Sequence, residues 1–286
     1  MYYLLVAVLE GSEVSVNLTF WNVDGVLSQV DLDAERPLVD LSQVTFFEPF
    51  ALVYLGMYLR HFNGLGKTFR ISTPEVQEAR QYLARVRFWQ RFNFSVKTIK
   101  QQSLVRFTSS TSLNDIVDIE KTETIAEDVS DAILKVLHQN TVRVNRTLIA
   151  ELVAELVDNF AQHSRTSLAA CAMQYYPRLR RVVFAIGDCG VGIRASLSSN
   201  ARYADLGQRP HHEAALRAFD PLVSRRPEGG TGLTEVAEGV ADEGGELVLA
   251  TGDGYVRMIG GRTQIGYQNF DLPGVQIEIS FPERRQ

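Results

Sequence analysis

Residues 186–193 read Ile-Gly-Asp-Cys-Gly-Val-Gly-Ile, a strand end that is followed by closely spaced glycines. The apolar run at 181–186 predicts a buried strand, and the acid Asp188 comes directly after it. A carboxylate in this position accepts hydrogen bonds from a purine amino group, while Gly190 and Gly192 leave room for a flat ring. An ordinary strand-to-loop turn has the same pattern, so the stretch needs support from the sequence around it.

A polar helix face lies upstream of this stretch. Residues 145–163 have apolar side chains at helical spacing, which predicts an amphipathic helix. Glu155 and Asn159 are four residues apart and therefore project from one face, and His163 follows one turn later. Such a face is either part of a binding site or an ordinary solvated surface.

A glycine cluster lies downstream, at Gly229-Gly230-Thr231-Gly232-Leu233, directly before a helix predicted at 234–243. Backbone N–H groups at a helix N-terminus that side chains do not shield are suited to phosphate. Glycine clusters also occur in flexible turns without a ligand, so this motif is ambiguous in isolation.

Three motifs thus occur in order along the chain: Glu155-x-x-x-Asn159, Asp188-x-Gly190-x-Gly192-Ile193 and Gly229-Gly230-x-Gly232-Leu233. Together they resemble the N, G1 and G2 boxes of the GHKL superfamily, which includes gyrase, heat-shock chaperones, mismatch-repair ATPases, sensor histidine kinases and anti-sigma-factor kinases. The resemblance extends over residues 120–282. It implies an α+β sandwich with helices on one face of a mixed sheet, which binds ATP together with Mg²⁺.

The resemblance also implies a role for each motif. It makes Asn159 the Mg²⁺ ligand through its amide oxygen, and Glu155 the general base that polarises the attacking water or hydroxyl. Asp188 would recognise the adenine amine, and His163 would either contact a phosphate or be a structural residue at a helix end. The other nucleotide-binding residues that it implies are Gly190, Gly192 and Ile193 around the ring, and Gly229, Gly230, Thr231, Gly232 and Leu233 around the phosphates.

Residues 194–228 resemble the nucleotide lid of the same superfamily, with a short helix expected around 213–219 in a mostly irregular segment. Arg225 and Arg226 would either clamp the γ-phosphate or remain solvated on a loop. One place departs from the family pattern, because Val275 follows Gly274 where many members have Gly-Thr. The missing threonine removes one hydrogen bond on the adenine side of the pocket.

The first part of the chain has the alternating strands and helices of an α/β unit. The polar stretch 108–112 is the expected boundary between two domains, 1–108 and 109–286. In the first domain, we expect strands at 3–9, 14–20, 37–41 and 67–71 and a helix at 49–62. A second helix should run to about Trp89, with Thr73 as its N-cap and Pro74 at its first position. In the second, we expect a further helix at 125–138 and strands at 245–251 and 275–281.

Residues 37–71 resemble a STAS domain, the fold of anti-sigma-factor antagonists, in the order strand, loop, helix and strand. In those antagonists, an acid–Ser–Ser/Thr–Gly signature starts the helix and receives a phosphate. The same place here reads Glu48-Pro49-Phe50-Ala51, which has no phosphoacceptor hydroxyl. The resemblance therefore implies a docking or dimerising surface for a protein partner or a second copy of the chain.

Composition narrows the partners and the compartment. The chain has 286 residues, 45% of them hydrophobic, and its net charge of −5 gives no general field that attracts a polyanion. Nucleic acid is therefore unsupported as a partner. Cys171 and Cys189 follow no metal spacing and are too few for a disulfide framework, and no apolar run is long enough to span a membrane. We expect a cytoplasmic protein.

Three functions fit these motifs, in decreasing order of support. The first is an ATP-driven regulatory switch with slow hydrolysis assisted by Glu155. The second is a nucleotide-gated interaction module that binds ATP and barely hydrolyses it. The third is a serine/threonine protein kinase of the anti-sigma type, in which Glu155 activates a hydroxyl of a partner. A sensor histidine kinase is disfavoured, because His138 lacks the acid and proline setting of a phosphoacceptor box.

Overall fold

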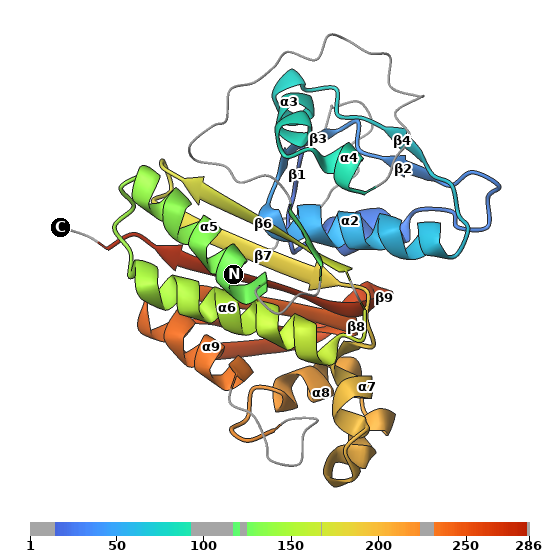
Figure 1. Ribbon diagram of the computed structural model, residues 1–286. Coiled ribbons are helices and arrows are strands. Elements are labelled where there is room, and N and C mark those ends of the chain that lie inside the picture. Colours follow the sequence, from blue (N-terminus) through green and yellow to red (C-terminus); the bar gives the residue numbers. More distant parts are fainter. Residues whose placement is uncertain (1–14, 93–116, 121–124, 167, 224–231, 285–286) are drawn as a thin grey trace.

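The computed structural model describes residues 15–92, 117–120, 125–166, 168–223 and 232–284 and has a mixed α/β fold. Its centre is a five-stranded sheet whose strands are β5 (Val117–Glu120), β6 (Leu168–Tyr176), β7 (Arg181–Asp188), β8 (Glu246–Ile259) and β9 (Arg262–Pro282). Their order is β5-β6-β7-β9-β8, and Figure 1 labels the last four of these strands. Within the described residues every pairing in this sheet is antiparallel, so the mixed sheet that the resemblance implies is not found there.

Three helices cover one face of the sheet (Figure 1): α5 (Ile125–Gln139), α6 (Arg146–His163) and α9 (Gly232–Asp242). Helix α6 begins where the sequence predicts, because the Asn145 side chain accepts a hydrogen bond from the Leu148 N–H at 3.3 Å. Alternate residues of the strands point to this layer and form one apolar core with the three helices. This core fixes α6 over the end of β7.

The other face of the sheet is covered by α2 (Pro49–Gly64), which lies between the sheet and the N-terminal strands (Figure 1). Every residue of α2 from Pro49 to Leu59 is buried. Alanines of β6, β7 and β8 on this face allow the helix to approach closely. A Cβ on Gly187 of β7 would lie 2.6 Å from a methyl carbon of Val53, so the close contact requires glycine there.

The N-terminal elements include two short parallel strand pairs, β1 (Val16–Leu18) with β3 (Val44–Phe47) and β2 (Leu38–Asp40) with β4 (Arg70–Ser72). The further helices described there are α1 (Val23–Ser28), α3 (Gln77–Arg85) and α4 (Phe88–Arg91). Asp24 of α1 accepts hydrogen bonds from the backbone N–H and the side-chain amide of Asn269, at 2.7 and 3.0 Å. These bonds attach the N-terminal elements to β9.

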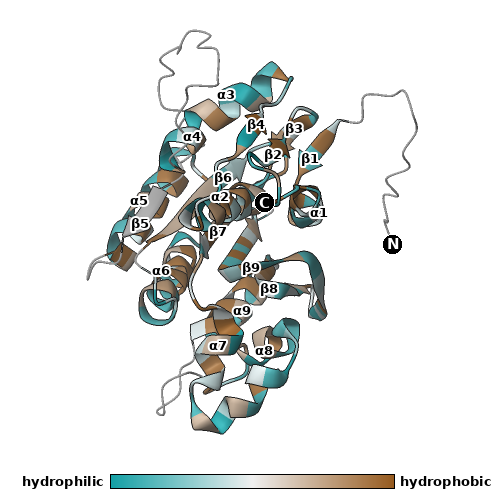
Figure 2. Ribbon diagram, turned by 90° about the vertical axis from the view of Figure 1, so that its right-hand side faces the viewer, coloured by the Kyte–Doolittle hydropathy of each residue, from teal (hydrophilic) through white to brown (hydrophobic). Residues whose placement is uncertain are grey.

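The segment after β7 forms α7 (Gly192–Ser198), a 3₁₀ helix (Ala201–Gln208) and α8 (His211–Arg217). Figure 2 shows α7 and α8 at the opposite end of the molecule from α3. The Nδ1 atom of His211 lies 2.8 Å from Oδ1 of Asp253, which attaches α8 to β8. The described part of this segment is therefore more regular than the sequence predicts.

Helix α3 begins later than the sequence predicts. Thr73 and Pro74 are expected at its start, but its N-cap is Val76. The Glu75 N–H donates to the carbonyl oxygen of Ser42 at 2.9 Å, and this long-range bond keeps the chain out of the helix at that point. The predicted start of the helix is wrong because the prediction uses only the local preferences of Thr73 and Pro74 for a helix start.

Other expectations are confirmed in part. The strand expected at 14–20 is limited to β1, because the Asn22 side chain accepts a hydrogen bond from the Thr19 N–H at 2.8 Å and turns the chain into α1. The strands expected at 245–251 and 275–281 are parts of the longer β8 and β9. The strand at 3–9 and the domain boundary at 108–112 lie outside the described residues.

None of the helices described has the length and apolar character needed to cross a bilayer.

A buried carboxylate joins α2 to the sheet. Glu278 of β9 is 7% exposed, and its Oε2 accepts a hydrogen bond from the Phe50 N–H at the start of α2, at 2.8 Å. Burial raises the pKa of Glu278 to about 8, and the neighbouring Glu48 carboxylate adds to this effect. Arg181 acts in the opposite direction. The carboxyl is therefore largely protonated at neutral pH.

Replacement of Glu278 by glutamine should change how stability depends on pH. The folded-state pKa of Glu278 lies above the unfolded value of 4.5, so its stabilising contribution is complete below about pH 4.5 and is lost as the pH rises towards 8. The free energy of unfolding of the wild type should therefore fall more steeply between pH 5 and pH 8 than that of Glu278→Gln. Urea unfolding at several pH values measures this, with the exposed Glu75→Gln as control, and equal slopes would contradict the assignment.

Candidate functional site

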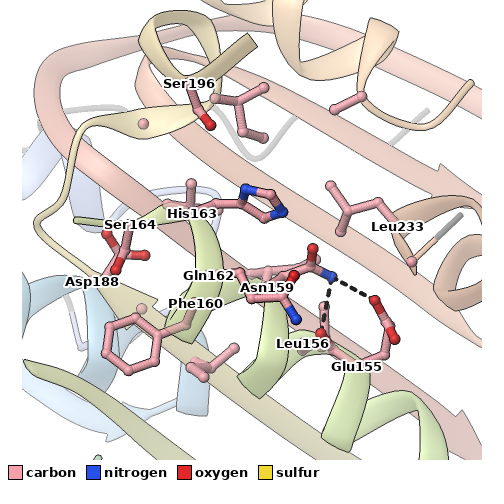
Figure 3. Close-up of a pocket in the computed structure, with 18 of the residues that line it drawn as sticks. Glu155, Leu156, Asn159, Phe160, Gln162, His163, Ser164, Asp188, Ser196 and Leu233 are labelled. Carbon is pink, nitrogen blue, oxygen red and sulfur yellow. Dashed lines mark hydrogen bonds between the residues drawn. The ribbon is translucent and has the colours of Figure 1, made fainter. Parts of the chain in front are cut away.

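A cavity of about 240 Å³ lies between α6, the end of β7, α7 and the start of α9 (Figure 3). The residues of the sequence motifs that line it are Glu155, Asn159, His163, Asp188, Gly192, Ile193, Gly232 and Leu233. Gly190 does not line the cavity and lies in the loop after Asp188. The predicted site residues outside the described part of the chain are Gly229, Gly230 and Thr231, together with Arg225 and Arg226.

Helix α6 presents Glu155 and Asn159 to one side of the cavity. The Asn159 Nδ2 donates hydrogen bonds to the backbone carbonyl oxygen of Glu155 at 2.9 Å and to its Oε1 at 3.2 Å. Burial raises the pKa of Glu155, and so do the nearby Asp158 and Glu235, while the bond from Asn159 lowers it. Glu155 therefore holds a proton more readily than an exposed glutamate does, which suits a general base.

The start of α9 packs directly against these two side chains. A Cβ on Gly232 would overlap with Oε1 of Glu155 and would lie 3.0 Å from the Asn159 Nδ2. Glycine therefore allows the helix to begin this close to the carboxylate. The first N–H groups of a helix have no partner within it and carry partial positive charge. This side of the cavity thus combines a carboxylate, an amide and the positive end of a helix.

Asp188 lies across the cavity from Glu155, with His163 and Asn159 between them in Figure 3. It is 5% exposed, and its Oδ1 accepts a hydrogen bond from the Gly190 N–H at 2.6 Å. Burial raises the pKa of Asp188 to about 7, although the N–H groups of Gly190 and Val275 act in the opposite direction. A carboxylate in this environment gains free energy from any ligand that donates a hydrogen bond to it.

Two glycines shape the loop after Asp188. A Cβ on Gly190 would overlap with the backbone carbonyl oxygen of Ser164, so a side chain would force the loop away from the end of α6. Gly192 has a φ angle of +73°, which favours glycine, and it begins α7. Both glycines therefore have a structural reason to be there, beside the role around a ring that the resemblance implies.

The cavity also has lining residues that the sequence motifs do not identify. Ser164 directly follows His163, and Ser196 lies on α7; Figure 3 shows both serines at the cavity. Val275 lines it from the strand that alternation predicts, although alternation does not say which residues border a cavity. The remaining lining residues are Leu156, Phe160, Gln162, Ile186, Gly187, Leu197, Ala218, Val223 and Ile277.

The described lining carries the carboxylates of Glu155 and Asp188, and no lysine or arginine belongs to it. A triphosphate would meet this negative charge, so a divalent cation would favour its binding here. Mg²⁺ is commonly held by one or two protein oxygens together with phosphate oxygens, and the Asn159 amide offers one such oxygen. No cluster of three or more His, Cys, Asp or Glu that could hold a metal ion occurs in the described residues.

No protein-family model matches the chain, and neither does any curated protein. Among solved structures, the chain is similar to the mycobacterial sensor histidine kinase MprB, with 20% sequence identity and a TM-score of 0.33. The match covers 60% of this chain and 99% of that chain. At this TM-score and identity, the similarity identifies neither a family nor an activity.

Alanine at two of these glycines should have different effects on stability. Gly190→Ala should lower the free energy of unfolding by about 1–3 kcal/mol, because its Cβ meets backbone atoms that cannot move independently. Gly232→Ala should cost less, because its Cβ meets the end of the flexible Glu155 side chain, which can rotate away. Urea unfolding followed by circular dichroism measures both, and equal losses would contradict the expected difference between the two glycines.

Proposed function

We propose that the cavity binds ATP with Mg²⁺ and that the protein is a nucleotide-dependent regulatory switch with slow ATP hydrolysis. The observation that supports this most is the contact of Glu155 and Asn159 with the start of α9, in the same cavity as the buried Asp188. This arrangement offers one place for a phosphate chain with its cation and another for a base.

At the phosphate end, the amide oxygen of Asn159 would hold Mg²⁺, which supplies positive charge next to the phosphate oxygens. The N–H groups at the start of α9 would bind phosphate oxygens. Glu155 would orient the attacking water and accept its proton, a role that its raised pKa favours. His163 projects into the cavity between the two ends in Figure 3 and would contact the phosphates.

At the base end, Asp188 would accept a hydrogen bond from the adenine amine, and the apolar side chains of Ile193 and Val275 would enclose the ring. The cavity of about 240 Å³ is smaller than the lower limit of about 300 Å³ for typical ligand pockets. Val223 and Gly232, which flank the segment 224–231, both line it. The lid would be residues 194–228, which include Arg225 and Arg226 and whose described part forms α7, the 3₁₀ helix and α8.

The same proposal assigns residues 109–286 to the GHKL superfamily and residues 1–108 to a STAS-like domain. The parallel pairing of β2 with β4, which flank α2 in the sequence, supports the second assignment, whereas β3 lies between β2 and α2 where the resemblance implies a loop. Helix α2 starts without a phosphoacceptor hydroxyl, and its Phe50 N–H is bonded to Glu278. The N-terminal part would therefore signal through contact with a protein partner or a second copy of the chain, in the cytoplasm, rather than by phosphorylation at this helix start.

Replacement of Glu155 by glutamine should separate binding from hydrolysis. Glu155→Gln should bind ATP with nearly wild-type affinity, because the amide keeps the size and the hydrogen bond to Asn159. Formation of ADP should fall by about 10²-fold or more, because glutamine cannot accept the proton. Isothermal titration and an ADP assay measure the two effects, with the exposed Glu151→Gln on the same helix as control. Unchanged turnover in Glu155→Gln would exclude this residue as the base.

Replacement of Asn159 by alanine should remove the effect of Mg²⁺ on binding. The wild type should bind ATP about tenfold or more tightly with Mg²⁺ than with a chelator, whereas Asn159→Ala should show no such difference. Titrations with and without Mg²⁺ measure this, and Asn140→Ala, at the end of α5, is the control. A Mg²⁺ effect of wild-type size in Asn159→Ala would place the cation on other ligands.

The fate of the γ-phosphate separates the three functions considered for this site. The chain is incubated with γ-labelled ATP and Mg²⁺, alone and in a cell extract. Label that ends as free phosphate supports the hydrolysing switch, and label on a protein supports the anti-sigma type of kinase. Label that stays on ATP despite tight binding supports a nucleotide-gated interaction module.

A further inference from the structure

Two backbone segments meet beneath the base end of the cavity. The first is the start of α7 at Gly192 and Ile193, and the second is the part of β9 at Gly274 and Val275. Ile193 and Val275 both line the cavity. The distance between the two segments therefore sets the width of the cavity next to Asp188.

One buried hydroxyl joins these two segments. Thr251 of β8 is 1% exposed and is not part of the cavity lining. Its Oγ1 accepts a hydrogen bond from the Ile193 N–H at 3.2 Å and donates one to the carbonyl oxygen of Gly274 at 2.8 Å. The hydroxyl thus uses its donor and an acceptor site on backbone groups of the two segments.

The glycines next to these bonds allow the close approach. Gly192 and Gly274 have φ angles of +73° and +91°, and a Cβ on Gly192 would lie 3.0 Å from the Thr251 Oγ1. A Cβ on Gly274 would overlap with the backbone carbonyl oxygen of Asp188. The Thr251 hydroxyl therefore anchors the loop after Asp188 and the β9 segment that packs against it.

This anchoring limits how the Asp188 carboxylate can meet a ligand. Its Oδ1 already accepts from the Gly190 N–H, and the Val275 N–H also acts on the carboxylate. Adenine offers a single donor group on this edge, its 6-amino group, and needs only one free acceptor position. Guanine offers N1–H and 2-amino donors side by side and pairs best with both oxygens of a carboxylate. A fixed loop therefore favours adenine over guanine.

We propose that Thr251 is a positioning residue that makes the cavity selective for adenine over guanine nucleotides, acting through the Ile193 and Gly274 backbones. The inference rests on the proposed nucleotide binding. Without the hydroxyl, two buried backbone groups lose their partner and the loop is released from β9, so the Asp188 oxygen that meets the adenine amine is no longer held in place. Selectivity then falls without any change in the residues that touch the ligand.

The test compares the dissociation constants of Mg-ATP and Mg-GTP for the wild type and for Thr251→Val, which has the same shape without the hydroxyl. The Kd for ATP should rise about tenfold in Thr251→Val while that for GTP changes little, so the selectivity should fall about tenfold. Thr251→Ser, which keeps the hydroxyl, should retain the wild-type selectivity. Thr45→Val in β3, remote from the cavity, removes another threonine hydroxyl bond and should leave both constants unchanged.

Each outcome decides a different question. If the wild type binds neither nucleotide, the proposed function fails and the inference fails with it. If the wild type binds ATP and Thr251→Val keeps the selectivity, or Thr251→Ser loses it, the inference alone is overturned. Should Thr251→Val not fold, amide hydrogen exchange at Ile193 serves instead. Slow exchange in the wild type and in Thr251→Ser supports the anchor, and fast exchange in the wild type overturns it.

Discussion

The burial of β7 on both faces is the constraint on which the rest of the structure depends. On one face its side chains enter the core beneath α5, α6 and α9, and on the other they meet α2. A strand with no solvated face is packed on both sides, so the position of its end is set by the layers above and below it. Asp188 is held in this way, because the Gln276 side chain also donates to its backbone carbonyl oxygen at 2.9 Å. The cavity is built on that fixed point.

The two carboxylates of the cavity show how the same chemical group takes different properties from its surroundings. Burial raises the pKa of both, but Asp188 is bonded by backbone N–H groups of the loop and of β9. Glu155 is in contact with a side-chain amide and with other acids. The first environment is rigid and suits recognition, whereas the second can adjust when charge develops nearby.

The elements that the sequence predicts well have a clear period. The apolar stripe and the Asn145 cap reveal α6, and the alternation at 275–281 reveals the end of β9. Strand β6 is missed because it is rich in alanine and buried on both faces, which removes the alternation. The start of α3 is misplaced because the chain before it is held by a hydrogen bond to Ser42, far away in sequence.

The lining of the cavity was predictable to a similar extent and for the same reason. Motif spacing identifies Glu155, Asn159 and Asp188, because these side chains point into the cavity from regular elements. Thr251 has no such signal, because its hydrogen bonds join segments from three different parts of the chain. Local sequence patterns do not reveal a contact between segments that meet only in the folded protein.

The complete burial of α2 has a consequence for how the chain folds. The helix is apolar on every side from Pro49 to Leu59, and one side is covered by strands that begin only at Leu168. During synthesis, α2 therefore leaves the ribosome long before its second partner exists. Until the sheet forms, that apolar side is exposed to water and to other chains. The contacts that bury α2 thus join residues that are far apart in the sequence, and such contacts form slowly. Slow folding with transient chaperone binding is the expected result.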